Sequence, residues 1–474
     1  KQELINENFE FWIWKDQERR DNLGELYNAK FNTNVKKRHD GSHITFDGIN
    51  SEVTLAKHQL DGAAMLIANK GGIMDHMVGA GKTYLMISAA IKMKQMGLIN
   101  KPMITGLKST IPHLIKDAKH LFPGAKILSP SLSDFSAKNR KRFLAKIQNN
   151  DWDLIIMSHE QFGSIPQDSE IQIELINEEI SQLEEEIRNI ENETGNSASK
   201  SILKGLEARI RTLTTKLVKL TDVVKDVEIL NFKQIGIDKI FVDESQMFKN
   251  LEYSTRINRV AGLGNPTGSK RSFNMLTAIR TLQKHHGGDM GTTFLSGTPI
   301  SNSLVEMYLL FKYLRPSKMK ELGYNTFDAW SKQFTVASNK LESSVTGTVK
   351  QNIRFREFIN IPELSILYSE ITDLRNDDNL KLPKPKVKGG GPKLILVQQS
   401  EYQQEWTDRF IKFAEQPFGN RDGDLIGKGE LTDNEQKAAM IMLTTLSAKL
   451  AIDVRLIDKN AEDNPTGKLS AVAK

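Results

Sequence analysis

The chain of 474 residues is too long for one ordinary core, since single domains usually contain roughly 100–200 residues. Hydrophobic residues make up 39% and charged residues 26%, which excludes a disordered or fibrous protein. The formal charge of +6 fits a phosphate-backbone partner but also many proteins that never meet nucleic acid, and the absence of cysteine excludes disulfides and thiolate zinc sites.

The N-terminal region shows neither a membrane span nor an export signal. No stretch of the sequence approaches the roughly 20 apolar residues needed to cross a bilayer, and the start lacks the basic-then-apolar layout of a signal peptide. We therefore expect a cytoplasmic protein with no membrane partner and, because the first residue is Lys1 rather than Met, a piece of a longer chain. Residues 1–50 are polar and aromatic-rich, which predicts a short helical leader that packs on the first domain.

From residue 51 the sequence alternates between helix-like and strand-like segments. Helical periodicity precedes and follows the strand-like GGIMDHMVGAGKT, and the later strand-like segments end in polar residues. This alternation predicts an α/β fold with a parallel sheet whose ligands bind where the strands end. The predicted lobe has two parts, residues 51–166 and 229–316, with further strands at Pro102–Gly106, Ile155–His159, Asp238–Glu244 and Thr292–Gly297.

Residues 167–228 interrupt this pattern with two apolar series at three- and four-residue steps, which indicate a coiled-coil insertion. A polar break at Glu193–Lys200 lets the two helices fold back as an antiparallel arm, and the acid-rich first helix matches the basic second one. A self-contained arm and a device that contacts a protein partner or DNA both fit this pattern. The seam residues are Ile173, Ile176, Ile180, Leu183, Ile187, Ile190, Leu206, Ile210, Leu213, Leu217, Leu220 and Val224.

The remainder of the chain divides into two sections. Residues 317–381 look helical and are predicted to lie between two lobes. Residues 382–474 begin with the Pro/Gly/Lys-rich hinge Leu382–Pro392. The strand-like LILVQQ after this hinge predicts the truncated start of a second lobe.

The string VGAGKTY contains the signature of a phosphate-binding loop (P-loop). Its glycines allow the backbone to wrap closely around phosphates, while the amides and the following helix N-terminus supply positive potential. We expect Lys82 to reach the terminal phosphates of ATP and Thr83 to hold Mg²⁺. The expected ATP-binding residues of this loop are Gly79, Ala80, Gly81, Lys82 and Thr83.

A hydrophobic strand that ends in Asp243 and Glu244 supplies the second half of the predicted site. This arrangement presents one carboxylate to magnesium and the next to a water molecule. LSGTPISN, residues 295–302, ends another strand with small hydroxyl residues that suit a phosphate sensor. Gln59 precedes the P-loop where its side-chain amide could read adenine.

Four of these strings together look like the Swi/Snf-related branch of superfamily-two helicases: LAKHQLDGA, GAGKT, VDES followed by Lys249-Asn250, and LSGTPISNSLVEMYLLFKYLRP. Others, such as DHMVGAGKTYLM, SHEQFGSIP and FDAWSKQF, resemble the helicase region of very large phage and conjugative-element proteins, including DarB-like antirestriction proteins. The resemblance runs from Trp12 to Ile457. It implies a RecA-like lobe of a double-stranded DNA translocase, and such proteins often also carry an adenine-specific DNA methyltransferase region.

Carried over position by position, the resemblance assigns Gln59 to adenine, Asp243 to magnesium and Glu244 to activation of the attacking water. It implies that four residues couple hydrolysis to movement, namely Gln246, Ser296, Gly297 and Thr298. It also implies sequence-independent contacts to DNA phosphates, and the residues expected to make them are Lys108, Ser109, Ser158, His159, Lys249 and Asn250.

Two positions depart from the family pattern. His76-Met77 replaces the usual acid pair before the P-loop glycines, and Ser245-Gln246 replaces the familiar Ala-His after the Asp-Glu pair. Gln246 lacks the ring that commonly links ATP to the coupling motif, although it can bridge by hydrogen bonds. No Asn-Pro-Pro-aromatic string occurs, so a methyltransferase active site would lie elsewhere in the parent chain.

The sequence leaves two hypotheses about function. The first is an ATP-dependent double-stranded DNA translocase that takes an arginine from a second lobe to stabilise the developing phosphate charge. No strand with a terminal basic pair follows the hinge before Lys474, so we expect an incomplete active site in this chain. The alternative is an ATP-binding scaffold with negligible hydrolysis that recruits a partner through its coiled-coil arm.

Overall fold

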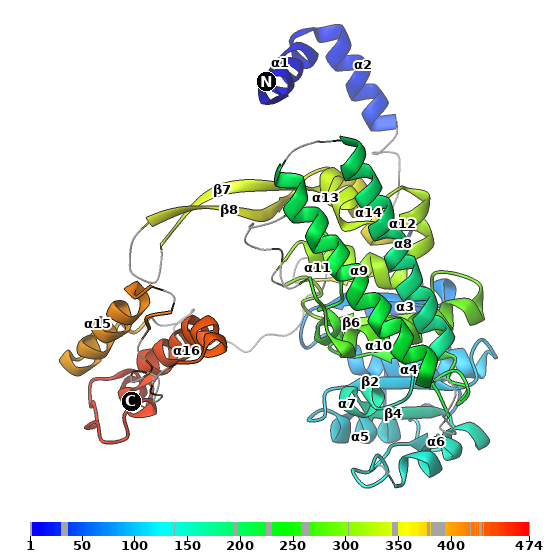
Figure 1. The fold of residues 1–474 in the computed structure, drawn as a ribbon. Helices are drawn as coiled ribbons and strands as arrows, with labels where there is room; N and C mark the ends of the chain where they lie inside the picture. Colours follow the sequence, from blue (N-terminus) through cyan, green and yellow to red (C-terminus); the bar gives the residue numbers. More distant parts are fainter. Residues whose placement is uncertain are drawn as a thin grey trace. The chain divides into compact units, whose positions relative to one another are not determined.

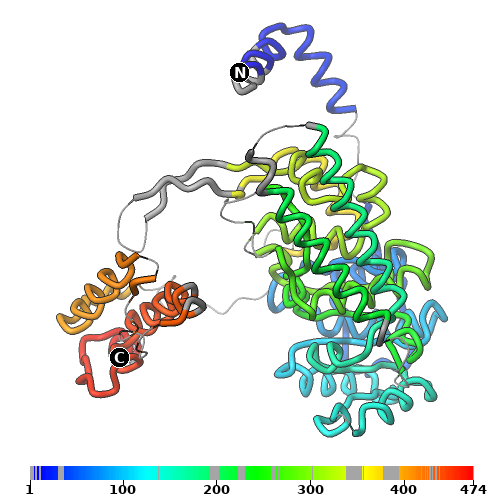
Figure 2. Tube along the Cα trace, viewed as in Figure 1, coloured from blue at the N-terminus to red at the C-terminus, as the bar shows by residue number. Residues whose placement is uncertain are grey.

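The chain forms two compact units in the computed structural model, and Figure 2 traces both from the blue N-terminus to the red C-terminus. The first unit comprises Lys1–Ser338 and Arg354–Leu382, and the second comprises Asn339–Ile353 and Pro383–Lys474. The structure describes residues 2–29, 37–136, 138–193, 197–223, 230–257, 263, 266–301, 303–343, 349–376, 380, 394–417, 419–421, 423, 425, 429 and 431–473.

A seven-stranded sheet in which all neighbouring strands are parallel forms the centre of the first unit. Its order β3-β4-β2-β5-β6-β1-β9 places β1, which leads into the P-loop, between β6 and β9. Strands β2 and β4 are buried along their whole length, as expected for a parallel sheet covered on both faces. The strands are β1 Gly72–His76, β2 Pro102–Gly106, β3 Ile127–Leu128, β4 Leu154–Ser158, β5 Lys239–Val242, β6 Thr292–Ser296 and β9 Thr372–Arg375.

Helices cover both faces of this sheet (Figure 1). Successive strand residues point to opposite faces, so Ile155 and Met157 enter one hydrophobic core while Leu154 and Ile156 enter the other. The predicted α/β fold with a parallel sheet is therefore confirmed. Helices α3 (Lys57–Asn69), α4 (Lys82–Gln95) and α5 (Ile111–Leu121) contribute to the second core, and α6 (Arg140–Asn149), α10 (Lys270–His286) and α11 (Val305–Leu314) to the first.

Helices α8 (Ser169–Glu193) and α9 (Ser197–Val223) make up the insertion and lie side by side (Figure 1). Their shared core contains Ile176, Leu183 and Leu213, which are almost fully buried. The two helices pack together as the apolar series requires, whereas the supercoiled geometry of a coiled coil stays a prediction.

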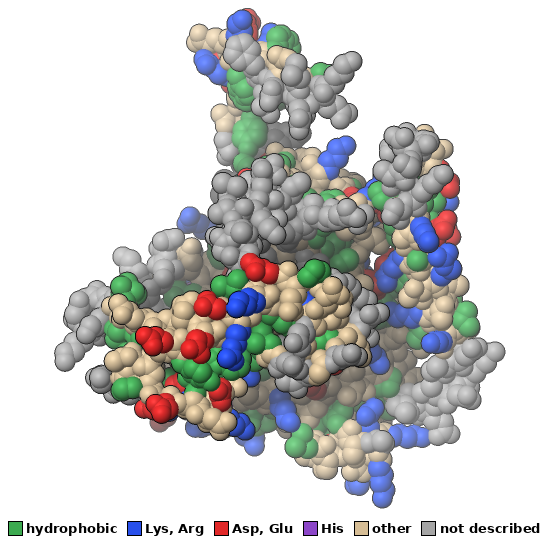
Figure 3. All heavy atoms as spheres, turned by 60° about the vertical axis from the view of Figure 1, so that its left-hand side comes forward, with side chains coloured by type: hydrophobic (Ala, Val, Ile, Leu, Met, Phe, Trp, Pro, Cys, Tyr) green, Lys and Arg blue, Asp and Glu red, His purple; other side chains and the backbone are tan. Residues whose placement is uncertain are grey.

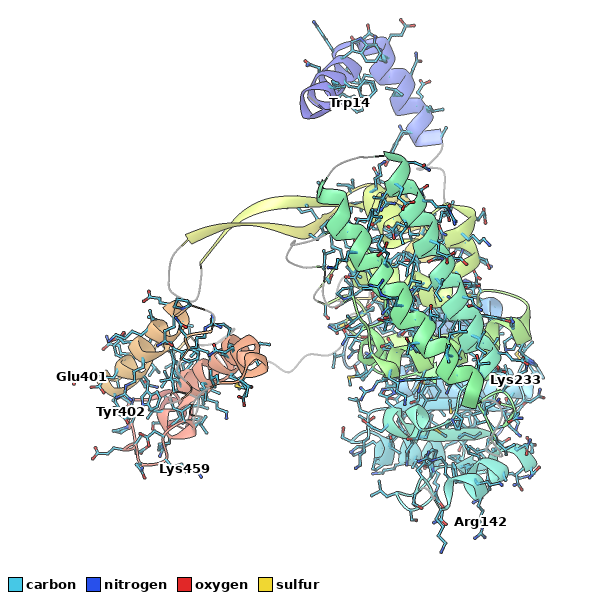
Figure 4. All side chains as sticks on the ribbon, viewed as in Figure 1. Trp14, Arg142, Lys233, Glu401, Tyr402 and Lys459 are labelled. Atoms are coloured by element: carbon cyan, nitrogen blue, oxygen red, sulfur yellow. The ribbon has the colours of Figure 1, made fainter. Side chains whose placement is uncertain are left out.

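The helix pair is not a self-contained arm, and this expectation was wrong. Lys284 on α10 forms an ion pair with Glu174 at 2.6 Å, and Arg256 forms another with Glu186 at 2.9 Å. The Lys216 ammonium lies 3.7 Å from the ring centre of Phe273 on α10. Near the start of the pair, Lys233, labelled in Figure 4, lies 3.5 Å from Asp168. The acidic helix α8 thus forms ion pairs with basic residues elsewhere in the first unit and also packs against α9.

The region predicted to be helical, residues 317–381, contains strands as well as helices. Helices α12 (Pro316–Glu321), α13 (Phe327–Phe334) and α14 (Ile361–Ile371) are present. Strands β7 (Thr335–Ser343) and β8 (Val349–Phe358) form a separate two-stranded sheet, and β9 joins the main sheet beside β1. Pairing with β1 decides the conformation of β9, because strand formation depends on tertiary neighbours more than on local composition.

The second unit is helical between residues 394 and 473, and its described part there includes no strand. LILVQQ, residues 394–399, is therefore not a strand here, and the predicted hinge Leu382–Pro392 lies outside the described residues. Apolar residues of α15 (Glu401–Glu415) and α16 (Asp433–Ile452), including Phe410 and Leu443, form a small core. The surface of these helices mixes acidic, basic and hydrophobic side chains (Figure 3). A second RecA-like lobe stays a prediction.

The N-terminal region contains two helices, α1 (Gln2–Lys15) and α2 (Gln17–Tyr27). Helix α2 buries no residue, and Trp14, labelled in Figure 4, is 56% exposed, so the described residues of these helices do not show the expected packing. Residues 37–50 are not helical. Gly41 instead approaches α3 so closely that a Cβ would lie 2.0 Å from the Leu60 oxygen, and its amide donates to Asp61. Among the described helices, none is long and apolar enough to span a membrane.

Candidate nucleotide site

The P-loop occupies the turn between β1 and α4. Gly79 and Gly81 have φ angles of 87° and 73°, which favour glycine over residues with a Cβ. A Cβ at Gly81 would also lie 2.4 Å from the side-chain nitrogen of Gln59. Helix α4 begins at Lys82 directly after this turn, so its N-terminus faces the loop as a phosphate site requires.

Three side chains hold the carbonyl groups of the P-loop. His58 Nε2 lies 2.8 Å from the Ala80 oxygen, and Gln59 Nε2 donates to the Gly81 oxygen at 3.0 Å. Lys82 Nζ donates to the oxygens of His76 at 2.7 Å and Met77 at 3.2 Å. Since these carbonyls are engaged by the protein, the loop is braced from helix α3, and Lys82 uses two of the three donors of its ammonium group on its own loop.

The structure places Gln59 against the P-loop instead of leaving its amide free for adenine. Its side-chain oxygen accepts from the Ala56 amide at 2.8 Å, and its nitrogen is used by Gly81. The residue is 8% exposed. The geometry therefore indicates that Gln59 supports the loop, and it does not support the expected reading of adenine.

Asp243 and Glu244 follow β5 and lie close to Lys82. Burial, reinforced by the charge of Glu244, raises the pKa of Asp243 to about 6, while Lys82 opposes this shift. Burial lowers the pKa of Lys82, against the charges of Glu244, Asp243 and Asp75. Glu244 has a φ of 51°, an uncommon left-handed conformation of the kind that clusters at functional sites. The structure thus brings together the two carboxylates and the lysine that the sequence predicted.

A chain of hydrogen bonds links Glu244 to the loop after β6. Gln246 Nε2 donates to Glu244 Oε2 at 2.5 Å, and Ser296 Oγ donates to Gln246 Oε1 at 2.8 Å. The Thr298 amide then donates to Ser296 Oγ at 3.0 Å. Gly297 lies against the P-loop, since a Cβ there would be 3.6 Å from Lys82 Nζ. The side-chain amide of Gln246 therefore bridges Glu244 and Ser296.

The donor set suits a magnesium ion bound together with a nucleotide. Among the described residues, no three metal-ligating side chains gather into one cluster. Mg²⁺ at nucleotide sites is typically held by one or two carboxylates together with substrate phosphates. Asp243, whose charge interacts with that of Lys82, and Thr83, which follows Lys82 in α4, would provide this type of partial site.

The residues expected to touch DNA fall into three groups. Lys108 and Ser109 are exposed in the turn between β2 and α5. Ser158 is 4% exposed, and its hydroxyl and Gln161 cap helix α7 (His159–Gly163) reciprocally. His159 is 1% exposed, contacts Thr105 at 2.9 Å, and its burial lowers its pKa to about 4. Both side chains are used inside the fold, which gives no support to a contact with DNA, and the DNA-binding role of Ser158 and His159 stays a prediction.

Lys249 and Asn250 form the third group, and they differ from each other. Asn250 is exposed, and its backbone oxygen accepts from the Ser269 amide at 2.8 Å. Lys249 is only partly exposed, and its Nζ lies 3.1 Å from Glu306 Oε1. A contact from Asn250 to DNA stays a prediction, whereas Lys249 has a protein partner.

The edge strand β9 adds residues that sequence reasoning missed. His76 Nε2 lies 2.8 Å from Asp373 Oδ2, and the Met77 amide donates to the Arg375 oxygen at 2.8 Å. Tyr368 on α14 donates to Asp75 Oδ2 at 3.0 Å. The only sequence signal for these contacts was the unusual histidine before the P-loop, which the structure explains as a buried partner of β9.

Comparisons with known proteins agree with this site. A family model described as "Probable helicase domain" matches residues 64–376, and a model of a domain of unknown function (DUF8437) matches residues 1–33. The chain is 20% identical over 418 residues to "Defense against restriction protein B" of Escherichia phage P1, a match that covers 80% of this chain and 18% of the phage protein. This chain thus spans less than a fifth of that relative.

Two solved structures of the Sulfolobus solfataricus SWI2/SNF2 ATPase core are also similar, one of them in complex with dsDNA. The complex is 13% identical with a TM-score of 0.38, and the match covers 91% of this chain and 65% of that one. The other is 11% identical with a TM-score of 0.35, covering 90% and 63%.

The family match extends over well over half of the chain, from α3 to the end of β9. It encloses the P-loop, both carboxylates and the hydrogen-bond chain from Glu244 to Thr298. The predicted relationship to the helicase region of large phage proteins is confirmed. The chain therefore belongs to the probable helicase domain family, and its first unit is a helicase-like ATPase domain.

Proposed function

We propose that this domain is the ATP-binding lobe of a double-stranded DNA translocase within a larger mobile-element protein of DNA modification or antirestriction. The observation that supports this most directly is the unbroken hydrogen-bond chain from Glu244 through Gln246 and Ser296 to Thr298. Such a chain lets the state of the nucleotide at Glu244 change the loop after β6. A P-loop protein that only stores nucleotide has no need of this connection.

The residues divide the work of hydrolysis. Lys82 would exchange its two carbonyl partners for the terminal phosphates, while Asp243 and Thr83 would hold Mg²⁺, which neutralises developing phosphate charge. Glu244 would orient and deprotonate the attacking water. When the terminal phosphate leaves, Gln246 would pass the change in the position of Glu244 to Ser296 and Thr298.

Duplex DNA is the proposed partner, and its contacts would be made through phosphates. Lys108, Ser109 and Asn250 are exposed near the carboxyl ends of the strands, where they can reach a backbone without reading bases. The phage relative is named for defence against restriction, and the proposed DNA partner is in keeping with that name. A second lobe of the parent chain would supply the arginine that completes the site.

The test is ATP turnover with and without duplex DNA, in a protein that continues past Lys474. We expect turnover to rise with duplex and to fall by about 10²–10⁴-fold in Glu244→Gln, because this variant loses its general base. Lys82→Ala should lose both turnover and nucleotide affinity. Lys116→Ala, an exposed change on α5, is the matched control and should behave like the wild type.

The alternative function is an ATP-binding scaffold that recruits a partner through the helix pair α8–α9. The observation that favours this alternative is that Lys82 donates to carbonyl groups of its own loop. These contacts describe a P-loop that is not arranged for hydrolysis. Tight nucleotide binding without turnover in the extended protein, at any duplex concentration, would support the scaffold and refute the translocase.

A further inference from the structure

Lys249, Ser301 and Glu306 form a closed triangle of polar contacts beside the nucleotide site. Lys249 Nζ lies 3.1 Å from Glu306 Oε1 and donates to Ser301 Oγ at 3.0 Å. Glu306 Oε2 accepts from the Ser301 amide at 2.6 Å and from its hydroxyl at 3.3 Å. Each of the three residues therefore contacts the other two.

The charge of Glu306 requires these partners. Its side chain is only 7% exposed at the start of helix α11, and a buried carboxylate is costly unless it is paired and hydrogen-bonded. Lys249 supplies the opposite charge, and Ser301 supplies two donors. Loss of Lys249 would remove this cation from the buried carboxylate, so we expect it to loosen the position of Glu306.

The triangle fixes one end of the loop that follows β6, residues 296–301. At the other end, Ser296 donates to Gln246, which in turn contacts Glu244. Between these ends, Gly297 lies against Val78 and Lys82 of the P-loop. The loop is thus attached at both ends to the segment after β5, because Gln246 and Lys249 belong to the 3₁₀ turn η2 (Ser245–Phe248) and the residue after it.

We propose that Lys249 and Glu306 are positioning residues that hold the 296–301 loop over the P-loop, so that a movement of Glu244 reaches the loop as a whole. This inference rests on the proposed function for its effect on turnover. With both ends fixed to one turn, the loop moves with η2 as a rigid body. Without the triangle, Ser301 is released and the loop can relax without following Gln246.

This role differs from the DNA contact expected for Lys249. A lysine that binds a DNA phosphate releases counterions, so its loss weakens duplex binding and lowers the salt dependence by about 0.9 in the log–log slope. A positioning lysine leaves both quantities unchanged. Lys108 is exposed in the turn after β2 and is proposed to contact DNA, with no positioning role. It therefore provides the matched control.

The experiment compares Lys249→Met, Lys249→Arg and Lys108→Met in the extended protein. Lys249→Met should reduce duplex-stimulated kcat by about tenfold, because misplaced groups near a reacting centre cost such factors. Its KM for ATP, duplex affinity and salt slope should stay within twofold of wild type. Lys249→Arg keeps the cation and should recover most of kcat. Lys108→Met should show the opposite pattern, with weaker duplex binding and kcat retained at saturating duplex.

A second measurement does not depend on turnover. Hydrogen exchange of peptides that contain the Ser301 amide should accelerate in Lys249→Met and remain slow in Lys249→Arg and Lys108→Met. Unchanged exchange in Lys249→Met would overturn the proposal, even in a protein that hydrolyses no ATP. The proposal would also be overturned if Lys249→Met weakened duplex binding and lowered the salt slope as much as Lys108→Met does. Absence of wild-type turnover together with accelerated exchange would count against the translocase and not against the triangle.

Discussion

Strand β5 begins with a buried lysine and is followed by a partly buried aspartate, and the neighbours of these two groups differ. At its start, Lys239 is 1% exposed, and its amine donates to the Lys70 oxygen at 2.7 Å. Directly after its end, Asp243 lies between Glu244 and Lys82. Burial lowers the pKa of Lys239 to about 7 and raises that of Asp243 to about 6, so each shift favours the neutral form.

The comparison shows that a shifted pKa by itself does not identify a functional group. Perturbed values are common at active sites, but structural burial produces them too. Asp243 combines its shift with a glycine-lined loop, a lysine and a second carboxylate, whereas Lys239 has one backbone carbonyl, the ring of Phe241 and the nearby charge of Asp238. We therefore expect the catalytic chemistry at the carboxyl end of β5 and a structural role for the lysine at its amino end.

Asp243→Asn should have the largest effect on nucleotide binding. The variant removes the charged ligand expected for Mg²⁺, and we expect magnesium-dependent nucleotide affinity to fall by more than about 100-fold, since even indirect partners of a metal cost 10–100-fold. Titration of a fluorescent nucleotide with and without Mg²⁺ measures this loss. Magnesium-free affinity should remain near wild type, and an equal loss in both conditions would show that Asp243 only supports the fold.

The pH dependence of the wild type should show the raised pKa of Asp243 directly. Since Mg²⁺ needs the ionised carboxylate, magnesium–nucleotide affinity should fall as pH drops below about 6, by up to tenfold per pH unit. The free energy of unfolding should depend on the protonation of Asp243 in the opposite way to the magnesium–nucleotide affinity. The pKa of Asp243 in the folded protein lies above its ordinary value of 3.8, so the contribution of this group to stability decreases as pH rises from about 4 to about 6.

Asp243→Asn provides the baseline for this titration, because it retains the protonation of the nucleotide itself. Subtraction of the two profiles leaves the part due to Asp243. Identical profiles for the variant and the wild type would mean that Asp243 is already ionised at low pH. In that case only Lys239, and not Asp243, would have a pKa shifted toward the neutral form.

Lys239→Met should have the smallest effect on nucleotide binding and a clear effect on stability. In the wild type, the amine keeps its proton up to its ordinary pKa of 10.5 in the unfolded chain, whereas burial lowers its pKa to about 7 in the folded protein. The free energy of unfolding should therefore rise by about 1.4 kcal/mol per pH unit between these values. Urea unfolding at several pH values should show this rise in the wild type and in the surface control Lys204→Met, but not in Lys239→Met.

Short motifs at strand ends made much of the site predictable from sequence. Lys82, Asp243 and Glu244 converge because the carboxyl ends of parallel strands share one edge of a sheet, and the string around each of them is local. The bridge through Gln246 was also foreseeable, since an amide can replace a ring as a hydrogen-bonding link. The catalytic roles of these residues stay predictions.

Contacts between distant segments could not be read from the sequence. His159 follows a strand as a surface histidine would, yet Thr105 and Phe248 enclose it. Lys249 looked like a free cation because Glu306, its partner, is far along the chain. Strand β9 was taken as helical because its four residues carry no strand pattern without β1 beside them. In each case tertiary neighbours determine the environment, and local composition does not encode them.

The late position of β9 has a consequence for the synthesis of the protein. His76 and its partner Asp373 are 297 residues apart, so at 5–20 residues per second a ribosome needs on the order of 15–60 s to make the second after the first. For most of that time both edges of β1 lack their neighbours, because β6 (Thr292–Ser296) also follows much later in the chain. Helices α8 and α9 can pair earlier through contacts close in sequence. We therefore expect nascent chains to acquire nucleotide binding only when β9 has emerged, long after the P-loop itself has left the ribosome.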